Sequence, residues 1–258
     1  IGIKDARFET LRVELPVLDG IVYTAERYSG IDAGKGNFSW VGKLTGPRRG
    51  FVSLGRVNDS VNLMASFSDS SYFYRGKVNN FTWQKKISKA KPCGGCRSMR
   101  TTIKDPRQRR AQSRSTWQNG DGNLIDLVFV YPGEVRAAAG STANIEAAIL
   151  AAVGDVNLCF RNSQINLIAR MVHMEEISYT PTGTLSTDLD RLIDKNDNYL
   201  DSVHSIRDQY SGDIVILLTT DGNLGGLAHL EDLSDLGLAG HRLPDLGRQH
   251  AGHGIADL

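Results

Sequence analysis

The sequence predicts a chain of two parts, an antiparallel β domain followed by an α/β domain with a twisted mixed sheet. Over residues 12–83, short strand-like runs alternate with Gly, Asp and Asn turn signals and show no helical periodicity. After residue 123, long apolar runs rich in β-branched residues alternate with helical patterns, which is typical of α/β domains. A chain of 258 residues is long enough for each part to bury a core.

Composition and charge narrow the range of partners. The chain is 40% apolar and 23% charged, with a formal net charge of +1, so it gives no global basis for binding nucleic acid or a membrane surface. No run of about eighteen apolar residues exists, and we therefore expect no membrane partner. The first residue is Ile1, so we expect a processed chain or a fragment whose signal peptide would lie outside it.

Seven short runs form the predicted β domain. Each is rich in Val, Tyr, Phe and Ser, and their regular spacing favours an antiparallel sandwich or a curled sheet. The predicted strands cover residues 12–15, 20–28, 37–44, 50–57, 60–67, 71–78 and 79–83.

Two cysteines follow in the motif KPCGGC, which contains Cys93 and Cys96. A CxxC motif has three ordinary interpretations: half of a zinc site, a redox pair or a local disulfide. No second CxxC pair exists, and the motif lies in a basic, Gly-rich stretch instead of at a helix start. A plain disulfide or two free thiols is therefore the leading interpretation from the residues themselves.

Residues 97–122 are polar and basic without periodicity, which predicts a linker. The linker contains the cluster RQRR, with Arg107, Arg109 and Arg110. Paired arginines between two domains could be reached by a processing protease, and a solvated charged linker is the alternative interpretation.

Strands and helices of the second part follow from periodicity. Residues 124–131 predict a strand buried on both faces, and residues 165–179 and 212–220 predict two more. Ser141 or Thr142 caps a helix whose small residues let it lie close against a sheet. On that helix Cys159 is expected to be a buried, inert thiol.

The remaining polar residues of this part are expected to be structural. His173 lies between apolar residues of a predicted strand, which favours a structural histidine over a metal ligand. Residues 194–198, DKNDN, lack the glycine and glutamate of a calcium loop. We therefore expect Asp194 to Asp197 to cap a helix over residues 199–210.

Three stretches carry a family resemblance: IDLVFVYPGEVRAAAGSTANIEAAILAAVGDVN, VHMEEISYTPTGTLSTDLDRLIDKNDNYLDSVHSIRDQYSGDIVILL and GGLAHL. Over residues 123–230 the chain resembles secreted bacterial zinc metallopeptidases of the reprolysin-like (adamalysin-like) metzincin type. FSWVGKLTG and its surroundings are similar to the propeptide of such enzymes. The resemblance implies a propeptide-like domain over 1–96, a linker over 97–122, an incomplete catalytic domain over 123–230 and a divergent tail over 231–258. It also implies zinc as cofactor, a protein or peptide as substrate and an extracellular location.

The zinc motif of that family, HExxHxxGxxH, is missing, because no two histidines of this chain are four residues apart. AGHGIADL echoes it only in part: His253 stands at the first ligand position, Gly254 at the catalytic glutamate and Asp257 at the second histidine. We therefore expect a metalloendopeptidase in proprotein form that is truncated, frame-shifted or inactive as given. The alternative is a non-catalytic pseudoprotease or binding protein whose β domain recognises a partner.

The resemblance also gives Cys93 a second interpretation. In zymogens of this kind a propeptide cysteine binds the catalytic zinc as thiolate and blocks the water position until the linker is cut. Cys93 precedes RQRR and the catalytic part, in the order that this role requires. A disulfide between Cys93 and Cys96 remains the competing interpretation.

Overall fold

The computed structural model describes residues 8–15, 21–68, 71–78, 83–87, 96–97, 123–220, 226–229 and 252–257. The chain divides into two compact units, one made of residues 1–90 with 133–163 and the other of 91–132 with 164–258. Each unit contains its own sheet. The domain boundaries predicted from the sequence rest on the family resemblance and stay predictions. The compact units are bounded differently, because residues 133–163 pack with the N-terminal strands.

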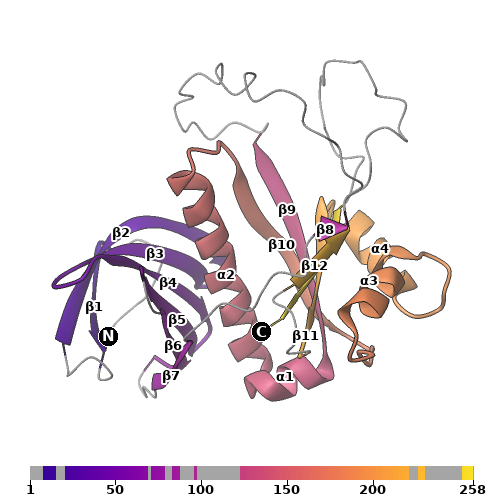
Figure 1. Ribbon diagram of the computed structural model, residues 1–258, viewed down its shortest axis with the longest axis horizontal. Helices are drawn as coiled ribbons and strands as arrows, with labels where there is room; N and C mark the ends of the chain where they lie inside the picture. Colours follow the sequence, from indigo (N-terminus) through magenta and orange to yellow (C-terminus); the bar gives the residue numbers. More distant parts are fainter. Residues whose placement is uncertain are drawn as a thin grey trace. The chain divides into compact units, whose positions relative to one another are not determined.

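The first unit contains a seven-stranded antiparallel meander in the order β1-β2-β3-β4-β5-β6-β7, shown curled in Figure 1. Six predicted strands are confirmed in position, whereas the seventh begins at Trp83 instead of ending there. Register shifts in β2 between Arg27 and Ser29 and between Asp32 and Gly34 mark bulges, which bend a strand and increase its twist. The strands are β1 (Thr10–Leu15), β2 (Ile21–Gly34), β3 (Asn37–Thr45), β4 (Gly50–Val57), β5 (Ser60–Phe67), β6 (Ser71–Lys77) and β7 (Trp83–Ile87).

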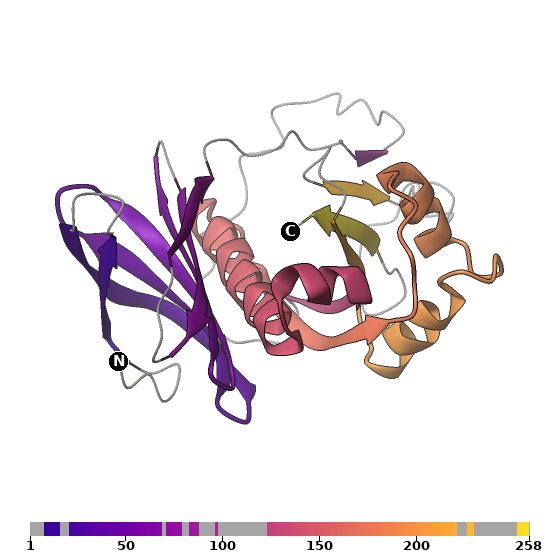
Figure 2. The ribbon, with the colours of Figure 1, turned by 90° about the horizontal axis from the view of Figure 1, so that it is seen from below.

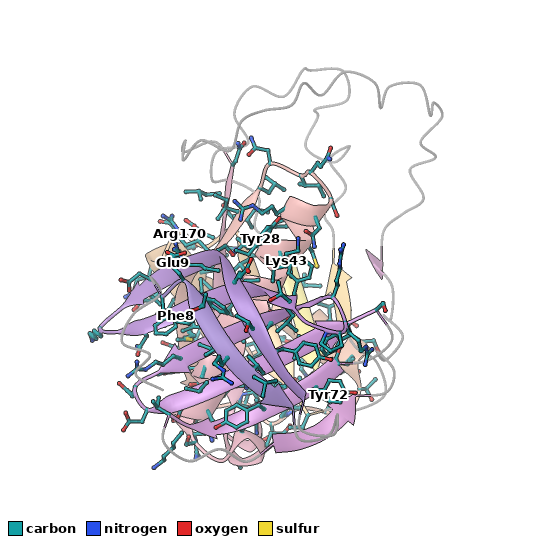
Figure 3. All side chains as sticks on the ribbon, turned by 90° about the vertical axis from the view of Figure 1, so that its left-hand side faces the viewer. Phe8, Glu9, Tyr28, Lys43, Tyr72 and Arg170 are labelled. Carbon is teal, nitrogen blue, oxygen red and sulfur yellow. The ribbon has the colours of Figure 1, made fainter. Side chains whose placement is uncertain are left out.

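One face of this sheet carries a large aromatic and aliphatic core. Trp40 is fully buried, its indole Nε1 donates to the carbonyl of Phe8 at 3.0 Å, and the Phe8 ring stacks on it with centroids 4.5 Å apart. Phe8 can be found in Figure 3. Phe8 is thereby held against the sheet. Other members of this core include Tyr23, Phe38, Leu44, Leu54, Leu63, Phe67 and Tyr74.

The opposite face of the sheet is covered by helix α2 (Thr142–Asn162), which follows the short helix α1 (Gly133–Ala139). Figure 2 shows α2 lying along the strands. The predicted cap is confirmed, because the Ser141 side chain accepts from the amide of Asn144 at 3.2 Å. By length and composition alone α2 could cross a bilayer, a test that core helices of soluble proteins also pass. Its buried residues are Ile145, Ala147, Ala148, Ile149, Leu150, Ala151, Val153, Gly154 and Leu158.

The buried thiol predicted on α2 is wrong. Cys159 is an exposed free cysteine, and Val156 is also 39% exposed. A helix that packs on a sheet buries one stripe of its surface, and both residues lie outside the stripe that reaches the strands. Proximity to the apolar Phe160 in sequence therefore did not imply burial.

The second unit contains a mixed, mostly parallel sheet in the order β10-β9-β11-β13-β12-β8. Both faces of β9 are buried from Leu127 onward, as its unbroken apolar sequence predicts. Strand β12 is antiparallel to β13, whereas the other pairs are parallel. The strands are β9 (Leu124–Pro132), β10 (Ile168–Ile177), β11 (Ile214–Thr219), β12 (Gly226–His229), β13 (Gly252–Asp257) and β8 (Cys96–Arg97).

Two helices, α3 (Leu185–Ile193) and α4 (Asp201–Gln209), pack against one face of this sheet. The sequence prediction missed α3 and placed the start of α4 two residues early. The prediction that Asp194 to Asp197 cap α4 is wrong. Asp194 accepts a hydrogen bond from the backbone amide of Asn196, and Asp197 accepts one from the backbone amide of Tyr199. Short-range turns of this kind compete with helix capping for the same carboxylates.

Asp188 is the one charged side chain on the buried stripe of α3. It is fully buried, and its Oδ1 accepts from the Tyr179 hydroxyl at 2.5 Å and from the Thr182 amide at 2.9 Å. Burial, followed by this hydrogen bond, raises the pKa of Tyr179 to about 12, although Arg191 opposes the shift. Asp188 therefore ties the loop that follows β10 to α3.

A first prediction concerns Gly55 in β4, where an added Cβ would collide with the backbone of Ala147 in α2. We expect Gly55→Ala to lower the free energy of unfolding by about 1–3 kcal/mol, since the helix must move away from the strand. Denaturant unfolding of the full chain measures this. Lys43→Ala, at an exposed position of β3, is the control and should change stability by less than about 0.5 kcal/mol. Equal stabilities of the two variants would contradict the prediction.

A second prediction concerns Asp188. We expect Asp188→Ala to cost about 2–4 kcal/mol, because the Tyr179 hydroxyl and the Thr182 amide both lose their acceptor. The exposed Asp190→Ala on the same helix is the matched control, with a change of less than about 0.5 kcal/mol. Thermal unfolding of both variants checks the difference, and a loss of similar size in both would show that the buried carboxylate is not responsible.

Candidate functional site

Most of the predicted site residues lie outside the described residues. Cys93, Arg107, Arg109 and Arg110 belong to this group. His253 lies on β13, of which the backbone alone is described. The roles assigned to these five residues stay predictions.

The backbone of the second sheet brings together three segments that are far apart in the sequence. His253 of β13 stands opposite His229 of β12, and Ala228 of β12 stands opposite Cys96 of β8. Cys96 and His229 therefore occupy neighbouring register positions. Of the residues Cys96, His229 and His253, the strand register places His229 and His253 at directly paired positions on a common face of the sheet.

The strand conformation of residues 252–257 differs from the helical zinc motif that AGHGIADL echoes. Two zinc-binding histidines four residues apart share a face because one helical turn separates them. In a strand the same spacing separates two residues by about 13 Å. Gly254 and Asp257 thus do not stand where the motif would need a glutamate and a second histidine.

A zinc site does not fit the part of the chain that the structure describes. No group of three or more His, Cys, Asp or Glu side chains that could hold a metal occurs among those residues. The sequence likewise contains no pair of histidines spaced i, i+4. We therefore assign no described residue to zinc and derive no catalytic step from it.

His173 on β10 has the surroundings of a structural histidine, as predicted. Its Nε2 lies 2.7 Å from Oε2 of Glu175, and its ring stacks on Tyr210 with centroids 3.7 Å apart and planes 7° from parallel. Glu175 therefore occupies one ring nitrogen of His173, and Tyr210 covers one face of its ring. The pairing of Glu175 with His173 is visible in sequence as i, i+2 spacing on a strand, whereas the stacking of Tyr210 is not.

The amino ends of β9, β10 and β11 are joined by a polar network. Arg170 donates to both carboxylate oxygens of Asp126 at 2.8 Å, and the Asp126 amide donates to Oδ2 of Asp213 at 2.8 Å. The amide of Asp213 in turn donates to the carbonyl of Asp126 at 2.8 Å. In parallel strands the chemistry-bearing loops follow the carboxyl ends, so this network holds the strands in register from the opposite end.

Comparison with known proteins identifies the second part of the chain. Residues 123–238 match the family model described as metallo-peptidase family M12B, reprolysin-like. A peptidyl-Asp metalloendopeptidase of Xanthomonas campestris pv. campestris is 30% identical over 124 residues, which cover 48% of this chain and 28% of the relative. A peptidyl-Asp metalloendopeptidase of Stenotrophomonas maltophilia is 32% identical over 110 residues, which cover 43% of this chain and 26% of the relative. The chain thus spans about a quarter of the length of these relatives.

A solved structure supports the fold. Metalloproteinase-II from Bacteroides fragilis aligns with 92% of this chain and 72% of its own, with a TM-score of 0.51 and 10% sequence identity. At this identity the similarity concerns the fold alone. Together with the sequence matches over the strands β9, β10 and β11, it confirms the resemblance predicted from the sequence: residues 123–238 are similar to the reprolysin-like M12B metallopeptidase family.

Proposed function

We propose that the chain is part of the proform of a secreted, zinc-dependent metalloendopeptidase. The observation that carries this proposal is the family match over residues 123–238, a segment that contains the parallel strands β9, β10 and β11. In this proposal residues 123–230 supply the N-terminal part of the catalytic domain, and the seven-stranded sheet is the prodomain. The activity of the whole protein is a proposal because the chain spans only about a quarter of its relatives.

The substrate is a protein or a peptide, since the family consists of peptidases. Both curated relatives carry the name peptidyl-Asp metalloendopeptidase. We therefore propose that the complete enzyme hydrolyses peptide bonds at aspartate residues. An extracellular location is proposed with the family resemblance.

Latency is proposed to depend on Cys93, with processing at Arg107, Arg109 and Arg110. Support comes from the backbone of β8, which starts at Cys96, three residues after Cys93, and pairs with β12. Strand β12 contains residues 226–229 of GGLAHL, the segment that precedes the expected zinc motif. Cys93 thus precedes, by three residues in the sequence, a strand that pairs with this segment.

Residues 1–258 by themselves are proposed to be catalytically inactive, because zinc binding by this family uses a histidine pair that the sequence lacks. The missing motif is expected in the source DNA, and sequencing beyond the codon of Leu230 tests this. We expect HExxH in one of the three forward frames. Absence of HExxH from all three would exclude a truncated or frame-shifted protease and leave the non-catalytic binding protein.

A direct assay tests the inactivity. We expect the purified chain to bind less than about 0.1 equivalent of zinc, an order-of-magnitude bound that follows from the lack of an i, i+4 histidine pair in the sequence, and to leave an aspartate-containing peptide uncut. The Xanthomonas campestris relative, assayed side by side, is the positive control. Stoichiometric zinc with chelator-sensitive cleavage by residues 1–258 would contradict the proposal.

A further inference from the structure

Helix α2 approaches the N-terminal sheet at two points where a side chain is missing. At Gly55 of β4 an added Cβ would meet the backbone of Ala147, and at Gly154 of α2 it would meet Ser39 of β3. At these two points the contact is made by backbone and small residues. Such close packing leaves little room for rearrangement, and a charge that is partly withdrawn from water there is poorly relieved.

Asp155 is a half-buried acidic residue of α2 at this surface. Its Oδ1 accepts a hydrogen bond from the hydroxyl of Ser53 on β4. Burial raises the pKa of Asp155 to about 6, and the hydrogen bond from Ser53 opposes this shift. Protonation of the carboxyl at mildly acidic pH therefore removes a charge from the helix–sheet contact.

Charged residues of the packed elements do not neutralise Asp155. Strands β4 and β5 present none on the helix side, where Ser53 and Gly55 lie on β4. On β2 and β3, Glu26 and Lys43 stand opposite each other and are exposed. On α2 itself, Arg161 donates to the carbonyl of Tyr28 at 2.8 Å and stacks on its ring. Glu146 lies more than two turns before Asp155, and burial raises its pKa also.

We propose that α2 and the seven-stranded sheet form a pH-dependent latch, in which protonation of Asp155 strengthens the hold of residues 8–87 on the helix. The helix belongs to the family-matched segment 123–238 in sequence, whereas the sheet precedes that segment. The latch would therefore keep the two pieces together after a cut in residues 97–122. Its use in releasing a prodomain rests on the proposed function; the latch itself does not.

The direction of the pH effect follows from the shift. A carboxyl whose pKa is raised from 3.8 to about 6 in the docked state favours docking fully below pH 3.8, and this contribution is lost as the pH rises through 6. Above pH 6 the loss is complete. Mild acid should thus keep the sheet on α2, and neutral medium should loosen it.

The test uses the full chain with residues 107–110 replaced by the recognition sequence of a site-specific protease. After cutting, the dissociation constant of the two pieces is measured by dilution and size-exclusion chromatography at pH 5 and pH 8. For the chain with Asp155 unchanged, we expect the dissociation constant to be about tenfold lower at pH 5 than at pH 8, from proton linkage between pKa values of 3.8 and about 6.

Two variants and a control test whether the pH dependence of the dissociation constant comes from Asp155. Asp155→Asn retains an acceptor for Ser53 and should reduce the pH effect to less than about twofold, because it cannot ionise. Ser53→Ala removes the hydrogen bond that favours the ionised carboxyl, so the pH effect should exceed that of the unchanged chain. Asp59→Asn, in the exposed turn between β4 and β5, should leave it unchanged.

Three results would overturn the latch: an unchanged pH effect in Asp155→Asn, a weaker effect in Ser53→Ala, or separation of the pieces on cutting at both pH values. Zinc binding and peptide cleavage do not enter this measurement. If the proposed peptidase function is wrong, this measurement still tests the latch. If the latch is wrong, the family match over residues 123–238 still stands.

Discussion

The close approach of α2 to the seven-stranded sheet is the contact on which the first unit depends. Gly55 and Gly154 bring backbone against backbone or against a small side chain. At this approach Ala147 and Ala151 of the helix are buried against the strand. The sheet already has an aromatic core on its other face. The helix thus completes a second layer on a side of the sheet that is rich in small and polar residues such as Ser39 and Ser53.

The second unit is held together differently. Its parallel strands β9 and β11 are apolar on both faces, and one face is covered by Leu185, Leu189 and Leu192 of α3. At the strand ends and the helix connections, Asp126 and Asp188 each have defined polar partners. A frame of this kind is typical of a domain that carries its chemistry on loops and appended helices.

The strands that resemble the family and the zinc ligands that its chemistry needs do not occur in the same residues of this chain. Residues 123–220 contain β9, β10 and β11 of the family-matched segment, and some of their polar residues make structural contacts, as His173 with Glu175 and Tyr210 illustrates. The family's zinc ligands are not among them, because the motif that would supply two histidines on one helical turn is missing from the sequence. The family resemblance of the segment therefore has a firmer basis than activity of the chain.

Local pattern in the sequence was sufficient for most elements. Alternation and turn residues placed six of the seven N-terminal strands, the apolar runs placed β9, β10 and β11, and Ser141 marked the start of α2. The order of the sequence motifs after residue 123 was sufficient to predict the family resemblance. Each of these features is encoded by residues within one or two turns or strands of each other, so no knowledge of distant contacts was needed.

Tertiary structure alone decided which surfaces meet. The sequence indicated that α2 could lie on a sheet, but not that this sheet would be the N-terminal one, nor that Cys159 would be exposed and Asp155 enclosed beside Ser53. A helix of small and apolar residues is compatible with more than one partner, and the choice depends on the glycines of a strand nearly a hundred residues away. Periodicity fixes which face of an element is apolar, whereas packing decides what covers it.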